Sequence, residues 1–135
     1  MYEQTQSASR CDDAFSAGDR KFILIVEDEK LLAWDIEQTL RDHDFQDVMV
    51  TTSMRGARDT LDSHAGQISL VILDLKLDDG DGTVLIDEFT DRNIAVLVVT
   101  GYSCFKEVQV PVLYKPFSTN ALLQAIASLL GSRRQ

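Results

Sequence analysis

Apolar runs recur along the chain after residue 20, and they predict buried strands. Each run is short, rich in β-branched residues and almost uninterrupted by polar side chains. The runs cover residues 22–26, 48–50, 68–73, 95–99 and 110–114. A run that does not alternate with polar positions is typical of a strand covered on both faces, as in a parallel sheet.

Between these runs lie segments whose apolar residues have helical spacing. In the first of them Leu32, Ile36 and Leu40 lie four residues apart and would form one apolar stripe. Serine is a favoured residue at a helix start and glycine at a helix end. We therefore predict helices at residues 30–42, from about Ser53, at residues 83–91, and from Ser118 to about Gly131.

Strands that alternate with helices predict a doubly wound α/β fold with a five-stranded parallel sheet. The segment from Thr100 to Pro111 has no clean helical period, so the fourth helix should be reduced or absent. Residues 21–131 should form one domain. Residues 1–20 are polar and predict a flexible tail, and residues 132–135 a short C-terminal tail.

Composition narrows the functional classes. The chain has 135 residues, of which 44% are hydrophobic, and a net charge of −9. This acidic balance disfavours binding to nucleic acid and to anionic membranes, both of which need clustered Lys and Arg. Cys11 and Cys104 form no metal-binding or disulfide motif. No apolar run approaches the roughly 18 residues of a membrane span, and no signal peptide is evident. We expect a cytoplasmic protein.

Chemically active side chains follow four of the predicted strands. Glu27 and Asp28 follow the first, Asp74 the third, Thr100 the fourth and Lys115 the fifth. Because ligands of open parallel sheets bind outside the carboxyl ends of the strands, we expect these side chains to meet.

This set suits phosphoryl transfer to a carboxylate. Glu27, Asp28 and Asp74 offer oxygen ligands to a hard cation, and Mg²⁺ is favoured because it takes few carboxylates and keeps several waters. A carboxylate can act as a nucleophile and form an acyl phosphate. A cation, the Thr100 hydroxyl and the Lys115 ammonium would then surround the phosphoryl oxygens.

Taken together, these residues resemble the receiver domain of two-component signalling. The resemblance covers residues 21–131. The motifs that carry it are Ile-Leu-Ile-Val-Glu-Asp-Glu at 23–29, Val-Ile-Leu-Asp-Leu at 71–75, Asp-Gly at 81–82, Val-Val-Thr-Gly at 98–101 and Tyr-Lys-Pro-Phe at 114–117. It implies a flavodoxin-like sheet of order 2-1-3-4-5.

The resemblance also implies a role for each site residue. Asp74 would be the phosphoacceptor, Asp28 a direct metal ligand and Glu27 a ligand through water. The Lys76 backbone carbonyl would complete the Mg²⁺ site. Thr100 would be the switch hydroxyl, Lys115 would contact the phosphoryl group, and the Lys115–Pro116 bond would be cis.

This chain departs from the family pattern at three places. Asp78 stands where the family usually has proline, and Val112 where it usually has the aromatic switch residue. The stretch from Thr100 to Lys115 is short. Thr100-Gly101-Tyr102 is similar to a Phe-Ala-Thr-Gly-type subgroup of stand-alone receivers associated with HWE-type histidine kinases. We expect such a sensor kinase as partner, and a phosphorylation-dependent shift of the loop at 101–110.

The acidic loop that contains Asp78, Asp79 and Asp81 is interpreted as a solvated loop. It lacks the register of glycine and closing glutamate that a Ca²⁺ loop needs. Its charge could nevertheless tune metal affinity or donor docking.

Several functions are compatible with these site residues. No output segment is evident after Gly131, so we expect a single-domain response regulator, not an enzyme, that either binds a downstream protein or serves as a phosphate sink. A receiver-like module that binds partners without phosphorylation is one alternative. An aspartyl-phosphate phosphatase is another, although it would need an acid where Lys76 stands.

Overall fold

The protein is described from a computed structural model, which covers residues 21–101 and 108–133. The tail predicted at residues 1–20, residues 134–135 and most of the loop predicted to respond to phosphorylation lie outside the described residues. Within the described part of the chain, none of the helices is long and apolar enough to cross a membrane.

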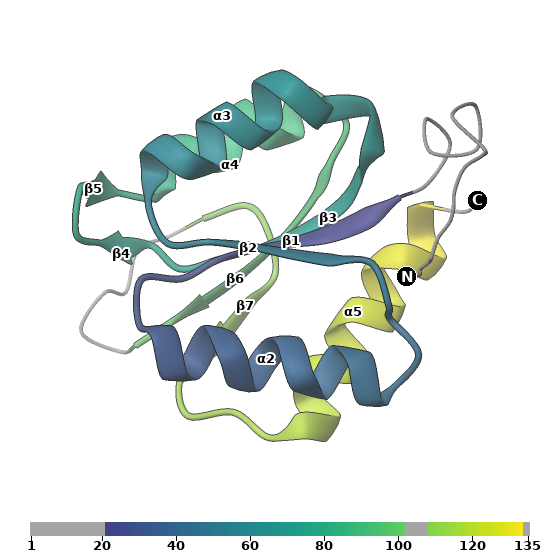
Figure 1. Cartoon of the computed structure of the whole chain (residues 1–135). Coiled ribbons are helices and arrows are strands. Elements are labelled where there is room, and N and C mark those ends of the chain that lie inside the picture. The colour runs from purple at the N-terminus through teal and green to yellow at the C-terminus, as the bar shows by residue number, and fades with distance from the viewer. Residues whose placement is uncertain (1–20, 102–107, 134–135) are drawn as a thin grey trace, which may run out of the picture.

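A five-stranded parallel sheet forms the centre of the molecule (Figure 1). Its strands are β1 (Phe22–Val26), β2 (Val48–Thr51), β3 (Ile68–Leu73), β6 (Ala95–Thr100) and β7 (Val112–Tyr114). They lie in the order β2-β1-β3-β6-β7, and every neighbouring pair is parallel. This is the predicted order 2-1-3-4-5, so the predicted doubly wound fold is confirmed.

Helices cover both faces of the sheet, as Figure 1 shows. They are α2 (Lys30–Asp42), α3 (Met54–His64), α4 (Thr83–Thr90) and α5 (Thr119–Arg133), with a 3₁₀ turn, η1, at Ala65–Gln67. Helices α3 and α4 pack on one face against a first core cluster that includes Leu24 and Leu73. Helices α2 and α5 pack on the other face against a second cluster that includes Ile25 and Ile72.

Burial on both faces explains the uninterrupted apolar runs. Successive strand residues point to opposite sides of a sheet, and here both sides are core. All six residues of β6 are buried, and Leu24, Ile25 and Val26 of β1 have no exposed surface. A single polar substitution in these strands would therefore face a dry core on either side.

Two predicted boundaries are wrong. Helix α5 passes through Gly131 and ends at Arg133. Gly131 has no positive φ, and the preceding Leu129 and Leu130 pack against the second core cluster, which outweighs the small helical cost of a terminal glycine. The last strand begins at Val112, because Pro111 has no N–H for the ladder, although its carbonyl accepts from Val98 N at 3.0 Å.

The segment after β3 contains a small hairpin that the sequence did not predict. Strands β4 (Lys76–Leu77) and β5 (Gly80–Asp81) pair antiparallel, so the acidic loop is partly structured. The reduced or absent helix predicted between β6 and β7 falls mainly on residues 102–107, which lie outside the described residues. Val112, at the position where the family has an aromatic residue, packs against the first core cluster.

Two side chains cap the start of α3. The predicted cap Ser53 accepts a hydrogen bond from Gly56 N at 2.9 Å. The Asp79 carboxylate, from the turn of the hairpin, accepts from Met54 N at 2.9 Å and from Arg55 N at 3.2 Å. Three of the four free N–H groups at the start of α3 are thereby satisfied, one by Ser53 and two by a distant segment.

The pH dependence of stability tests how much the hydrogen bonds from α3 to the Asp79 carboxylate contribute. The hydrogen bonds from Met54 and Arg55 lower the pKa of the Asp79 carboxyl. Its contribution to stability is therefore present above the ordinary aspartate pKa of about 3.9 and is lost as the pH falls through the folded-state pKa. We expect Asp79→Asn to unfold at lower urea than the wild type at pH 7, with a gap that closes in strong acid.

Asp59→Asn is the matched control for this measurement, because Asp59 is an exposed carboxylate on the same helix. It should change the urea midpoint little at any pH. A gap between wild type and Asp79→Asn that stays constant as the pH falls would contradict the capping role.

Candidate functional site

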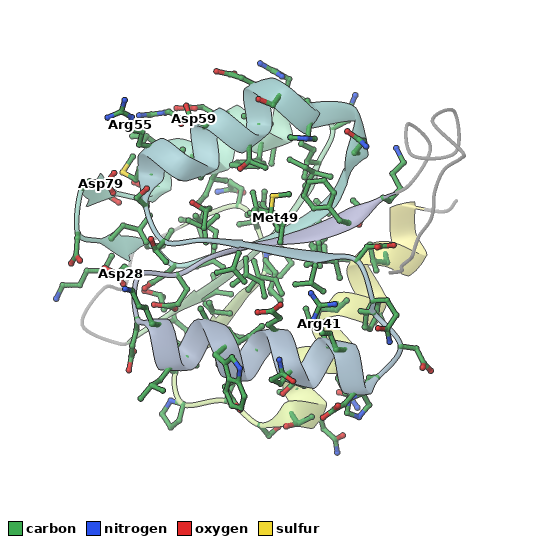
Figure 2. The ribbon with its side chains drawn as sticks, viewed as in Figure 1. Asp28, Arg41, Met49, Arg55, Asp59 and Asp79 are labelled. Carbon is green, nitrogen blue, oxygen red and sulfur yellow. The ribbon has the colours of Figure 1, made fainter. Side chains whose placement is uncertain are left out.

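The predicted site residues converge at the carboxyl edge of the sheet. Parallel pairing aligns the strand ends, with Val26 opposite Leu73, Leu73 opposite Val98 and Thr100 opposite Tyr114. Glu27, Asp74 and Lys115 each directly follow one of these strand ends, and Asp28 comes one residue after Glu27. Figure 2 shows Asp28 at this edge, near the start of α2.

Three carboxylates form the acidic part of the site. One ligand oxygen from each of Glu27, Asp28 and Asp74 lies within 4.8 Å of the others. Glu27 is 1% exposed and Asp74 is 4% exposed, whereas Asp28 is half-buried. Two carboxylates buried side by side are costly unless positive charge compensates them.

Lys115 supplies that positive charge. Its Nζ lies 3.0 Å from Glu27 Oε1 and 3.3 Å from Asp74 Oδ2. Its backbone N–H donates to the Thr100 carbonyl at 2.8 Å, which fixes the lysine at the end of β7. The Lys115–Pro116 peptide bond is cis, as predicted.

Backbone N–H groups hold the two buried carboxylates in place. Glu29 N donates to Glu27 Oε2 at 3.1 Å, and Lys76 N donates to Asp74 Oδ1 at 3.2 Å. Behind the acceptor, a Cβ on Gly82 would lie 2.6 Å from the Asp74 carbonyl oxygen. Only glycine therefore fits between the acceptor and α4, a constraint that the Asp-Gly motif alone does not reveal.

The electrostatics of the site follow from burial and from this ion pairing. Burial raises the pKa of Glu27 to about 7, and the negative charge of Asp74 adds to the rise. Burial lowers the pKa of Lys115, but the hydrogen bond to Glu27 and the charge of Asp74 outweigh it, so the net shift is upward. The lysine stays protonated at neutral pH, whereas Glu27 takes up a proton readily.

The buried Thr100 hydroxyl has no hydrogen-bond acceptor among the described residues. Thr100 is 1% exposed, and its Oγ1 has no hydrogen-bond partner within residues 21–101 and 108–133. A buried hydroxyl without a partner costs about 1–3 kcal/mol, so an arriving oxygen acceptor would be favoured.

The donor set fits Mg²⁺. Carboxylate oxygens are its preferred protein ligands, and two of these three carboxylates are fixed by backbone hydrogen bonds. Lys76 lies two residues after Asp74, as the family pattern requires, and its carbonyl remains a predicted ligand. A divalent cation would also favour the ionised form of Glu27, whose burial otherwise favours protonation.

The hairpin after Asp74 places two further acids near the site. The carboxyl groups of Asp78 and Asp28 lie within hydrogen-bonding distance of each other, which raises the pKa of Asp78. Asp79 instead binds the start of α3. The sequence showed an acidic loop but not these separate contacts, because neither depends on a local spacing.

Comparison with known proteins identifies the class. Residues 23–127 match the family model of the response regulator receiver domain, so the chain belongs to this family. Receiver domains accept phosphoryl groups in an acidic Mg²⁺-binding pocket and interact with histidine kinases and downstream partners.

Individual relatives agree with this assignment. The chain is 31% identical, over 131 residues, to the transcriptional regulatory protein PdtaR of Mycobacterium tuberculosis, matching 91% of this chain and 62% of that protein. It therefore spans less than two thirds of that curated relative.

Two solved structures are similar over most of their own length. A response regulator receiver protein from Sinorhizobium medicae has a TM-score of 0.74 and 27% identity, covering 85% of this chain and 98% of that one. The solution structure of SdrG from Sphingomonas melonis has a TM-score of 0.70 and 33% identity, covering 82% of this chain and 97% of that one.

Replacing Lys115 tests whether its ammonium compensates the buried acids. We expect Lys115→Met to lower the free energy of unfolding in EDTA by about 2 kcal/mol, because it leaves buried carboxylates unpaired. The loss stays below that of a fully buried pair because Glu27 can take up a proton. Saturating Mg²⁺ should restore part of it. Urea unfolding with and without Mg²⁺ measures both effects.

Lys30→Met removes an exposed lysine close in sequence to the same site and serves as the control. It should change stability little in either buffer. Equal losses from the two variants, or a loss in Lys115→Met that Mg²⁺ leaves unchanged, would contradict this role of the ammonium.

Proposed function

We propose that this receiver domain accepts a phosphoryl group from a sensor histidine kinase onto Asp74, with Mg²⁺ bound by Glu27, Asp28, Asp74 and the Lys76 carbonyl. The proposal rests on one observation, the convergence at one sheet edge of three carboxylates, an ammonium that contacts two of them and a buried hydroxyl without a partner. A location in the cytoplasm, within reach of its kinase, fits this chemistry.

The transfer uses the residues as follows. An Asp74 carboxylate oxygen attacks the phosphorus of the donor, a phosphohistidine. The new O–P bond forms as the P–N bond breaks, and the imidazole leaves with the bonding electron pair and takes up a proton. When bound, Mg²⁺ supplies positive charge that reduces repulsion between the phosphoryl oxygens and the carboxylates.

Two side chains of this chain stabilise the transferred group. The Lys115 ammonium, already 3.3 Å from Asp74 Oδ2, pairs with a phosphoryl oxygen. The Thr100 hydroxyl donates a hydrogen bond to a second phosphoryl oxygen, which is the acceptor that it lacks among the described residues. Because Thr100 ends β6, its movement passes to the loop that follows and changes the surface offered to a protein partner.

The kinase is proposed to be of the HWE type, on the resemblance of Thr100-Gly101-Tyr102 to the subgroup associated with those enzymes. The phosphorylated domain then either signals by binding a downstream protein or serves as a phosphate sink that loses its phosphoryl group without a downstream partner. Both outputs use the same phosphoacceptor site.

Phosphorylation with a small donor tests the proposal. We expect acetyl phosphate and Mg²⁺ to add one phosphoryl group to the wild type, detected by intact mass, and none to Asp74→Asn. Excess EDTA should abolish the adduct. Asp81→Asn, which removes a nearby carboxylate outside the proposed site, should still be phosphorylated. An adduct that persists in Asp74→Asn would contradict the assignment of the acceptor.

Thr100→Val separates the hydroxyl's chemistry from its packing. Because Oγ1 has no partner among the described residues, the nearly isosteric valine should leave the unphosphorylated protein as stable as the wild type or more stable, by up to about 1 kcal/mol. Phosphorylation should slow, since one donor to the phosphoryl group is gone. Urea unfolding and the time course of adduct formation measure the two effects. A clear loss of stability would show that the hydroxyl already has a structural partner.

A further inference from the structure

The turn between β4 and β5 carries two adjacent carboxylates that face different parts of the molecule. Asp79 binds the first turn of α3, and Asp78 lies beside Asp28 of the metal site. Figure 2 shows Asp79 at the start of α3 and Asp28 on the same side of the molecule. The turn therefore links a helix start to the acids that follow β1.

The Asp79 side of the turn is firmly anchored. Its carboxylate accepts from Met54 N at 2.9 Å and from Arg55 N at 3.2 Å, where the positive end of the helix dipole favours an anion. Next to it, a Cβ on Gly80 would lie 2.5 Å from Met54 Sδ, so the hairpin backbone lies directly against the helix. Leu77 and Met54 are both buried in the first core cluster.

The Asp78 side faces the most exposed of the three site carboxylates. Asp28 is half-buried, whereas Glu27 and Asp74 are almost inaccessible. Asp78 is itself exposed, and its carboxyl lies within hydrogen-bonding distance of that of Asp28. Within residues 21–101 and 108–133 no ammonium pairs with Asp28 or Asp78, whereas Lys115 pairs with Glu27 and Asp74.

A cation at this edge is expected for reasons independent of the turn. Glu27 and Asp74 are buried carboxylates that share one ammonium, and the buried Thr100 hydroxyl lacks a partner in the described chain. Asp78 would add negative charge to the solvent-facing side of that same site.

We propose that Asp78 is an outer carboxylate beside the metal ligand Asp28, which strengthens the binding of a divalent cation through its charge, and that Asp79 is the positioning residue that holds it there. This inference rests on the proposed Mg²⁺ site. It gives a role to the residue that stands in place of the usual proline, and it makes the hairpin part of the metal-binding apparatus.

Titration of the metal-free protein with Mg²⁺ alone, followed by calorimetry, tests the role of Asp78. We expect Asp78→Asn to weaken Mg²⁺ binding about three- to tenfold, because a carboxylate next to a metal ligand is lost. Asp59→Asn makes the same change in net charge on α3 away from the site, and it should alter the affinity by less than about twofold. Metal-free Asp78→Asn should also unfold at a higher temperature than the wild type, since repulsion with Asp28 is relieved.

Asp79 is tested by combining variants. Because Asp79 acts through Asp78, Asp79→Asn should weaken Mg²⁺ binding in the wild type but not further in Asp78→Asn. Unlike Asp78→Asn, it should lower the unfolding temperature of the metal-free protein. Additive losses of affinity in the double variant would overturn the positioning role.

Asp28→Asn distinguishes failure of this inference from failure of the proposed function. If Asp28→Asn weakens Mg²⁺ binding strongly while Asp78→Asn behaves like Asp59→Asn, the metal site stands and the role of Asp78 is excluded. If Asp28→Asn also binds Mg²⁺ as the wild type does, the cation does not use these acids, and both proposals fall.

Discussion

The site depends on the burial of two carboxylates beside one ammonium. Glu27, Asp28 and Asp74 carry three negative charges when ionised against the single positive charge of Lys115, which leaves two negative charges for a divalent cation to balance. Without a cation, burial raises the pKa of Glu27 to about 7, so protonation relieves part of the repulsion. Metal binding, proton uptake and the lysine contact thus all compensate the negative charge of the same carboxylates. A phosphoryl group would add further negative charge to the site.

The sheet makes that concentration of charge tolerable. Strands β1, β3 and β6 are covered on both faces by core residues, so their ends are held in fixed register. Backbone N–H groups of Glu29 and Lys76 point at the buried carboxylates and need no rearrangement to do so. Preorganised donors of this kind stabilise charge at little cost when chemistry occurs. The hairpin and α3 extend the same rigid support to the outer side of the site.

Much of this arrangement is predictable from the sequence, for identifiable reasons. A strand buried on both faces leaves an uninterrupted apolar run, so β1, β3 and β6 were located closely, and the strand ends then indicated Asp74 and Thr100. The hairpin of Lys76–Leu77 and Gly80–Asp81 is too short to leave a hydrophobic period. The contact of Asp79 with α3 joins residues 25 apart in the chain, which no local pattern encodes. Helix α5 passed its predicted end because packing of Leu129 and Leu130 outweighed the signal of Gly131.

The most direct test of the central claim is to locate the phosphoryl group after transfer from a kinase. The protein would be mixed with a histidine-phosphorylated HWE-type kinase and Mg²⁺, reduced with borohydride to trap the acyl phosphate, digested, and mapped by peptide mass spectrometry. The account predicts one modified position, Asp74. Modification at any other residue, or transfer that proceeds equally well in Asp74→Asn, would contradict it.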